Sequence, residues 1–274
     1  MEETPKVETT PKKVYELDFP SKHTICGNST MEEEVYEKKF TQVCESVIKN
    51  NSSFDTNIVK AFFEIAPIYG IDPVRAISQS ILETGWFKYA GSAVQPSHHN
   101  YCGLGVTVNG KPGNIFDTIE NGVRAQLQHL YAYGSKNVLP ANETLIDERF
   151  KYVTRGIAPT WEELAGRWAV PGFDGSDPEA AIKNGTTYGQ KIDKIYNSII
   201  ALSVSQEIIE KYFNKVESDV NTENQSKPIE PEQPKIERPE NPSDNKGIDT
   251  TKVNTLLDII TKILTFILNL FKKN

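Results

Sequence analysis

A helical repeat of apolar residues between Phe54 and about Tyr212 is the feature that most constrains how this chain folds. Gly and Pro divide the repeat into segments, and these two residues typically begin or end helices. One helix should begin near Asp55 and end at Gly70. The next should be capped by Asp72 and has a proline at its first position. This part of the chain is therefore expected to form a helical domain.

Three further helices are predicted in the same region. One carries apolar residues from Val123 to Leu130, and another begins with a capping box formed by Thr160 and Glu163. The last contains the isoleucines that begin at Ile192. Helices thus account for most of the predicted domain.

A hairpin signal lies between the predicted helix that Asp72 caps and the predicted helix that carries Val123. Residues 106–116 read VTVNGKPGNIF, with β-branched residues on both sides of Asn109 and Gly110. An Asn-Gly pair favours the tight turn that joins two antiparallel strands. The predicted fold class is therefore α+β: mainly α-helical, with a small β-hairpin lobe.

The composition changes on both sides of this domain, which we assign to residues 54–214. Residues 1–14 are expected to be a disordered arm, and residues 15–53 form an N-terminal extension to which the sequence gives no role. Residues 215–250 contain five prolines, no aromatic residue and an excess of acidic side chains. This composition predicts an extended, disordered linker.

Residues 251–274 have the pattern of a C-terminal amphipathic helix. Its apolar stretch from Leu256 to Phe271 would be only about 24 Å long as a helix, which is short for crossing a bilayer. We expect residues 253–271 to lie on a membrane surface or to self-associate; folding back onto the domain is the alternative. The narrow polar stripe of this helix consists of Asp258, Lys262, Thr265, Asn269 and Lys272.

Charge and cysteine content exclude several classes of function. The formal net charge of −7 and the isoelectric point near 5.3 provide no basic surface for a phosphate backbone, so nucleic acid is not an expected partner. The three cysteines are too few and too scattered for a disulfide framework. His98, His99 and Cys102 are a poor zinc signal, and no phosphate-binding glycine motif occurs. We therefore predict no metal and no cofactor.

Glu83 is the first candidate for chemistry. It stands at the predicted end of the second helix, beside Ile81, Leu82 and Trp86. Apolar surroundings disfavour an ionised carboxyl, which raises its pKa and keeps it protonated near neutral pH. A general acid for cleavage of a glycosidic bond requires this property. The alternative is an exposed glutamate at the end of a helix.

Several spaced blocks give this region a resemblance to a known family. They are ILETGWFKYAG, NYCGLG, GVRAQLQHLYAY, RFKYVTRGIAPTWEELAGRWAVPG and YGQKI, in this order between Phe54 and Ile200. The series resembles the glucosaminidase domains of peptidoglycan hydrolases, family 73 of the glycoside hydrolases, in the form found in phage and clostridial lysins. The resemblance implies a lysozyme-like fold, with two lobes across a groove. It also implies hydrolysis of the β-1,4 bond after N-acetylglucosamine in cell-wall glycan.

The resemblance also assigns roles to individual residues. It implies that Glu83 is the catalytic acid and that Tyr188 lies in the groove near the scissile sugar, although a tyrosine at a helix start can also simply pack. Asn100 matches an asparagine that can bind a sugar, or it could cap a turn. The candidates for stacking on sugar rings are aromatic residues that could equally belong to the core: Trp86, Tyr101 and Trp168.

The second carboxylate is less well defined. Members of the family often carry one on the β-lobe about 35 residues after the acid, and residues 106–116 contain none. Asp117 and Glu120 are the nearest, and either could activate a water molecule with inversion. Attack by the acetamido group of the substrate, with retention, is the other possibility. Asp117 could instead be the N-cap of the next helix, with Glu120 in its first turn.

The expected function is therefore that of an endo-β-N-acetylglucosaminidase with peptidoglycan glycan strands as its partner. A lytic transglycosylase and a non-catalytic, wall-binding virion module are the alternatives. The first residues, MEETPKVETTPKK, lack the apolar region of a signal peptide. We therefore expect a protein made in the bacterial cytoplasm that reaches the wall through holin-type release, by lysis or as part of a phage particle.

Overall fold

The computed structural model describes residues 19–27, 31–106 and 111–213. The predicted arm (1–14), linker (215–250) and C-terminal helix (251–274) lie outside these residues. The chain separates into units of residues 1–225 and 226–274, and every described residue belongs to the first.

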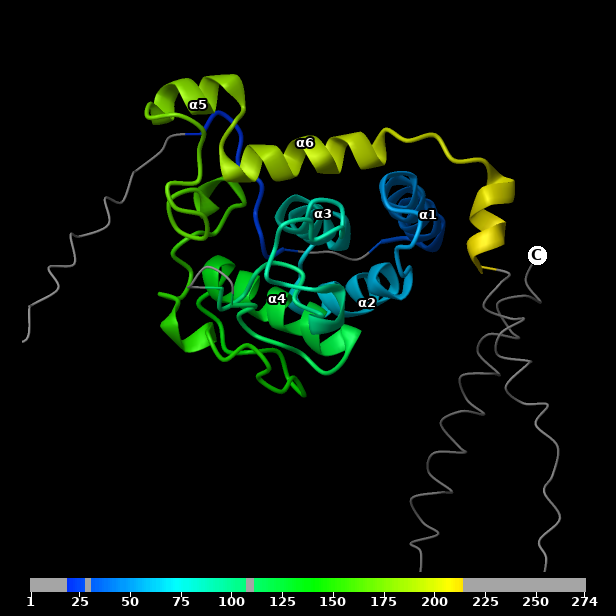
Figure 1. Cartoon of the computed structure of the whole chain (residues 1–274), viewed down its shortest axis with the longest axis horizontal. Coiled ribbons are helices and arrows are strands. Elements are labelled where there is room, and N and C mark those ends of the chain that lie inside the picture. The colour runs from blue at the N-terminus through cyan, green and yellow to red at the C-terminus, as the bar shows by residue number, and fades with distance from the viewer. Residues whose placement is uncertain (1–18, 28–30, 107–110, 214–274) are drawn as a thin grey trace, which may run out of the picture. The chain divides into compact units, whose positions relative to one another are not determined.

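Helix α3 (Pro73–Thr84) lies at the centre of this unit, between α6 and α4 (Figure 1). The side chain of Asp72 accepts hydrogen bonds from the backbone N–H groups of Val74 and Arg75, as the capping motif predicted. Residues from 73 to 81 are buried without interruption, so neighbouring elements cover the helix on all sides. Gly85, at φ 59°, ends it in the left-handed conformation that glycine adopts without steric cost.

Helices α2 and α4 pack against each other, and α2 also contacts α3. Helix α2 (Asn57–Ile65) continues as the 3-10 helix η1 (Ala66–Tyr69) and stops at Gly70, which confirms the predicted first helix. Helix α4 (Ile119–Gly134) carries the predicted stripe of apolar residues, all fully buried. Burial of each large apolar side chain contributes about 1.5–3 kcal/mol to folding.

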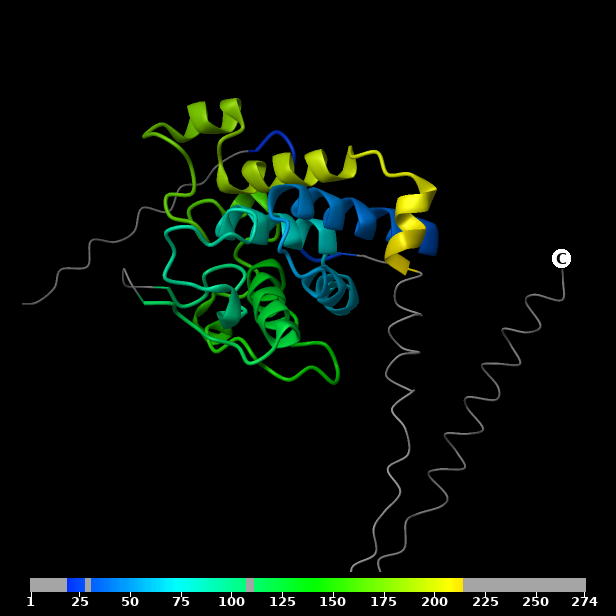
Figure 2. The ribbon, with the colours of Figure 1, turned by 45° about the vertical axis from the view of Figure 1, so that its right-hand side comes forward.

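Helix α1 (Glu33–Asn50) belongs to the same core, although its sequence suggested no role. It contacts α2, α3 and α6 (Tyr188–Ile200), and Figures 1 and 2 show α6 lying across α3 and α1. The amide of Gln42 donates to the backbone carbonyls of Ile200 and Leu202, at 2.9 and 2.7 Å. The N-terminal extension therefore satisfies carbonyl groups at the C-terminal end of α6.

Shorter helices connect these elements: α5 (Pro178–Asn184), η2 (Pro96–His98), η3 (Phe150–Tyr152), η4 (Glu162–Leu164) and a helical stretch at 206–213. The helix predicted after Thr160 is only the single turn η4. Thr160 and Glu163 do form the predicted reciprocal hydrogen bonds. Ala165 then turns extended and Gly166 adopts φ 76°, so helical geometry cannot continue.

The predicted β-hairpin lobe is not confirmed. Its turn, residues 107–110, lies outside the described part of the chain. The flanking residues form no strand there; Asn114 N–H donates to Leu104 O at 2.9 Å, and Gly105 and Gly113 both have φ above 70°. Described residues are otherwise helical or irregular, with isolated β-bridges only, which is consistent with a lysozyme-like helical domain.

None of the helices among the described residues combines the length and the apolar character needed to cross a bilayer.

Candidate active site

Glu83 occupies the last turn of α3 and lines a pocket of about 280 Å³. The other walls come from residues 169–174 and from the start of α6, including Asp174, Tyr188 and Lys191. The residue as a whole keeps solvent-exposed surface, so it stands at the wall of an open pocket. This is the position that the sequence assigned to a catalytic acid.

Two side chains donate to the same oxygen of Glu83. Its Oε1 accepts a short hydrogen bond from the Tyr188 hydroxyl and a 3.3 Å bond from Trp168 Nε1. Surrounding protein atoms strip water from the carboxyl and raise its pKa, and the two donors partly offset this by stabilising the ionised form. Loss of water is the largest of these effects, so Glu83 holds its proton to higher pH than a free glutamate does.

A buried polar network fixes the direction of the Tyr188 proton. Gln126 Nε2 donates to Gln79 Oε1 at 2.8 Å, and Gln79 Nε2 donates to the Tyr188 oxygen at 3.0 Å. Because that oxygen already accepts from an amide, the tyrosine O–H must point to Glu83. Burial and the nearby carboxyl hold the Tyr188 pKa well above its usual range, so the hydroxyl remains a donor.

Trp168 is held by a second set of contacts. Its ring meets those of His129 and Tyr133, with centroids 5.0 and 5.7 Å apart. His129 Nδ1 lies 2.6 Å from an oxygen of Asp147, which fixes the orientation of the imidazole. His129 is therefore a packed and hydrogen-bonded residue that positions Trp168.

The segment before α6 brings another carboxylate to the pocket. Tyr188 N–H donates to Gly172 O at 2.7 Å, and Phe173 forms a β-bridge with Thr187. These bonds hold Asp174 beside α6, where Lys191 Nζ reaches its Oδ1 at 2.6 Å. Since residues three apart share a helix face, α6 presents Tyr188 to Glu83 and Lys191 to Asp174.

Asn100 does not face a sugar site in this structure. Its Nδ2 donates to the carbonyls of Leu104 and Asn114, each at 2.9 Å, and its Oδ1 accepts from the Leu104 N–H. The side chain is 1% exposed. The turn-capping alternative is therefore correct, because the backbone of residues 100–114 uses both donors of the amide.

Asp117 and Glu120 lie outside the lining of the Glu83 pocket. The N-cap of α4 is Thr118, whose hydroxyl accepts from the Asn121 N–H, so the proposed Asp117 cap is wrong by one residue. Hydrogen bonds from its own backbone and from Thr118, and then the charge of His99, hold the Glu120 pKa below its usual value. Glu120 is an ionised residue of the first turn of α4.

Trp86 and Tyr101 also lie outside the pocket lining. Trp86 is half-buried against the core at φ 62°, in the turn that follows α3. Tyr101 is 1% exposed and packs near Phe62 and Phe87. Of the three aromatic candidates, only Trp168 has a hydrogen bond to Glu83 among the described residues.

One group in the described part of the chain has metal-ligand geometry: His23, Glu162 and Asp193. His23 Nδ1 lies 2.6 Å from Glu162 and 3.1 Å from Asp193. Arg75 also pairs with Asp193, and a guanidinium there competes with a cation. We interpret the cluster as a polar contact that ties His23, in residues 19–27, to Asp193 of α6.

The sequence analysis did not identify three residues of the site: Gln79, Gln126 and Asp174. Gln79 precedes Glu83 by four residues and so shares its helix face, which was a usable signal. Gln126 and Asp174 had no such signal, because only folding brings them to α3 and α6.

A carboxyl acid with a raised pKa, held by two donors in an open pocket, is the kind of group that glycoside hydrolases use as a general acid. Residues 59–201, 143 of the 274 residues, match the family described as "Glucosaminidase: Mannosyl-glycoprotein endo-beta-N-acetylglucosaminidase". The chain belongs to this family, which confirms the resemblance.

A relative in Borreliella burgdorferi, described as an uncharacterized protein, is 37% identical over 119 residues. The aligned region covers 43% of this chain and 57% of that relative, so little more than half of the relative's length is matched. No solved structure matches the chain significantly.

Proposed function

We propose that the protein is an endo-β-N-acetylglucosaminidase that cleaves the β-1,4 bond after N-acetylglucosamine in peptidoglycan. The observation that carries this proposal is the double hydrogen bond to Glu83 Oε1 from Tyr188 and Trp168. A carboxyl in this setting has a raised pKa and a fixed orientation, as an acid that protonates a glycosidic oxygen needs. Membership of the glucosaminidase family supports the linkage.

The geometry assigns a role to each oxygen of Glu83. Since Oε1 accepts two hydrogen bonds, the proton of the acid form resides on Oε2. Oε2 then delivers this proton to the leaving oxygen as the bond to the anomeric carbon breaks. The carboxylate that remains is stabilised by Tyr188 and Trp168, whose hydrogen bonds strengthen as negative charge develops.

We propose Asp174 as the second carboxylate, in place of the two candidates from the sequence. It lines the same pocket as Glu83 and is oriented by Lys191. In this role it takes a proton from a water molecule that attacks the anomeric carbon from the opposite face, which inverts the configuration. Attack by the acetamido group of the substrate is the competing route, and it gives retention.

Mass spectrometry of the ends released from purified peptidoglycan tests the proposed reaction. The wild-type protein should release reducing N-acetylglucosamine ends, and Glu83→Gln should release none, because glutamine cannot donate the proton. Glu179→Gln, on the exposed start of α5, is the matched control and should retain activity.

Two other outcomes would overturn the proposal. Anhydro-muramic ends would identify a lytic transglycosylase, and absence of products from the wild-type protein would favour a wall-binding module.

A further inference from the structure

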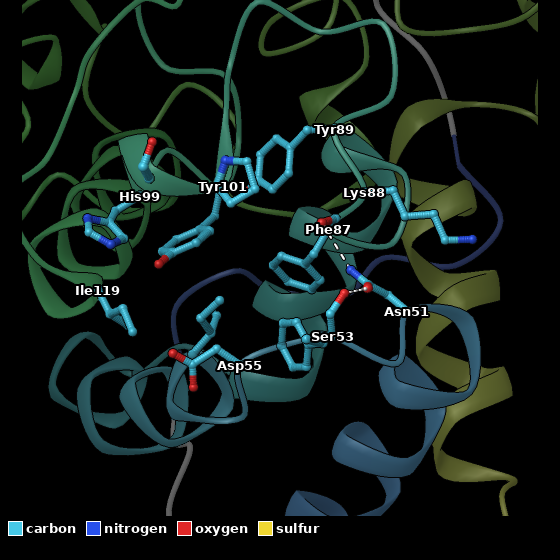
Figure 3. A pocket seen from close by; sticks show the side chains of 13 residues that line it. Asn51, Ser53, Asp55, Phe87, Lys88, Tyr89, His99, Tyr101 and Ile119 are labelled. Atoms are coloured by element: carbon cyan, nitrogen blue, oxygen red, sulfur yellow. Dashed lines mark hydrogen bonds between the residues drawn. The ribbon is translucent and has the colours of Figure 1, made fainter.

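A second pocket, of about 520 Å³, lies apart from the lining of the Glu83 pocket. Its walls come from the turn between α1 and α2, from the loop after α3 and from η2 (Figure 3). We call it the tyrosine pocket and define it by Asp55, Phe87, Tyr89, His99 and Tyr101. The proposed hydrolysis uses none of these residues.

Two buried hydroxyls in this pocket are unsatisfied. Tyr89 is 6% exposed and Tyr101 is 1% exposed, and neither hydroxyl has a hydrogen-bond partner among the described residues. Figure 3 shows the Tyr101 hydroxyl directed to the space between His99, Ile119 and Asp55. Buried polar groups nearly always have partners, so the unpartnered Tyr101 hydroxyl, which points into the pocket, indicates that a ligand supplies its partner.

The charges near Tyr101 select a cation. Asp55 lines the pocket, and Figure 3 shows its carboxyl across the space into which the Tyr101 hydroxyl points. His99 Nδ1 donates to the Phe116 carbonyl, which can only accept, at 2.9 Å. This end of the pocket therefore offers the Asp55 carboxylate and the Tyr101 hydroxyl oxygen, which can both accept hydrogen bonds from a bound ammonium.

Aromatic walls also favour a cation on an aliphatic stem. The rings of Phe54 and Phe87 lie 4.7 Å apart, and those of Phe87 and Tyr101 lie 6.1 Å apart. Ring faces attract cations and cover methylene groups. Lys88 is on the rim away from Asp55 in Figure 3, with its ammonium directed outward. The pocket therefore has an acidic end and a basic rim.

We propose that the tyrosine pocket binds the terminal ammonium of a short aliphatic amine, with Asp55 and the Tyr101 hydroxyl as its partners. Peptide chains of the wall that carry a diamino acid are a source of such a group, and this assignment of the source rests on the proposed function. An acidic group on the same ligand would face Lys88. The enzyme would then recognise peptide-bearing glycan at a site separate from Glu83.

Calorimetric titration of the full chain with Nα-acetyllysine tests the proposal. The matched probe is Nα,Nε-diacetyllysine, which keeps the stem and lacks the charge. We expect saturable binding of the first compound and at least a tenfold weaker response to the second, because an ammonium gains charge-assisted hydrogen bonds. Asp55→Asn and Tyr101→Phe should each weaken binding by about tenfold.

The choice of variants distinguishes a loss of ligand affinity from a loss of folding stability. Tyr101→Phe removes a hydroxyl that has no described partner, so its melting temperature should stay the same or rise while its affinity falls. Tyr152→Phe, at a tyrosine 71% exposed, is the control and should bind as the wild type does.

Absence of binding by the wild-type protein, equal binding of both compounds, or unchanged affinity in both pocket variants would overturn the proposal. Because this titration involves no cleavage, its failure is distinct from a failure of the reducing-end assay.

Discussion

At the scale of single residues, opposing effects act on the pKa of the Glu83 carboxyl. Removal of water raises its pKa, and the donors Tyr188 and Trp168 lower it again. Tyr188 therefore acts through Glu83 as a positioning residue as well as lining the pocket. Positioning of Glu83 by Tyr188 affects the rate, whereas hydrogen bonding by Tyr188 affects the pH at which Glu83 loses its proton. The two effects can therefore be measured separately.

The variant Tyr188→Phe should move the basic limb of the kcat/KM profile to higher pH. The acid must be protonated, and loss of a donor to the carboxylate raises the Glu83 pKa further, so the active form persists to higher pH. A pH–rate profile on purified walls measures the shift, with Tyr152→Phe as the control. A lower rate with an unmoved limb would show that the tyrosine serves packing only.

The second carboxylate is tested by comparing Asp174→Asn with Asp117→Asn. The Asp174 change should lower kcat by about 10²–10⁴-fold, as expected for loss of a general base. Asp117→Asn should leave kcat near the wild-type value, since Asp117 does not line the Glu83 pocket. Asp174 is exposed and its ion pair with Lys191 is superficial, so the free energy of unfolding should change by less than about 0.5 kcal/mol.

NMR measurement of which anomer of the product forms first completes that comparison. The inverted product supports Asp174 as the base, whereas retention together with an active Asp174→Asn protein would assign the attack to the acetamido group.

At the scale of secondary-structure elements, α1 shows how a segment without an evident role stabilises the site. Gln42 is 2% exposed and bonds two carbonyls near the C-terminal end of α6, the helix whose first residue is Tyr188. Close packing fixes the other end of α6. A Cβ added at Gly189 would meet Trp161 O at 2.3 Å, so only glycine allows this approach.

Replacement of Gln42 by alanine should therefore destabilise the protein. Two partly buried hydrogen bonds to the carbonyls of Ile200 and Leu202 would be lost, and each such bond contributes about 0.5–1.5 kcal/mol. Urea unfolding followed by circular dichroism measures the change in free energy, and Lys38→Ala, at an exposed position of the same helix, is the control. Equal stability of the two variants would mean that the Gln42 hydrogen bonds contribute little to the domain.

At the scale of the whole molecule, the Glu83 site and the tyrosine pocket lie within residues 51–191. The terminal segment of residues 251–274 lies outside the described part of the chain, and its role on membranes or in self-association stays a prediction, as does the route to the wall.

Truncation after residue 214 tests the role of that segment. The shortened protein should keep its hydrolytic activity on soluble glycan, because every residue of the Glu83 site remains. It should lose binding to liposomes or self-association, measured by co-sedimentation and analytical ultracentrifugation against the full chain. Liposome binding and sedimentation that do not change would contradict the amphipathic-helix prediction.

The sequence alone determined the features that depend on neighbouring residues. Helix limits at Asp72 and Gly70 follow from local hydrogen bonding and backbone sterics, and the prediction of an acid at Glu83 came from its local motif blocks. Tyr188 was predicted to lie in the groove because its own block is distinctive. These sequence patterns involve residues that are close together in the chain, so they can be recognised without knowledge of the fold.

Only the tertiary structure decided which residues surround the acid. Asp174 and Gln126 reach the site from segments far from Glu83 in sequence, and no periodicity relates them to it. The sequence left two roles open for Asn100, because its partners, the carbonyls of Leu104 and Asn114, are arranged by an irregular loop. A side chain's environment depends on packing between distant segments, and that packing is set by the burial of the whole core rather than by any local pattern.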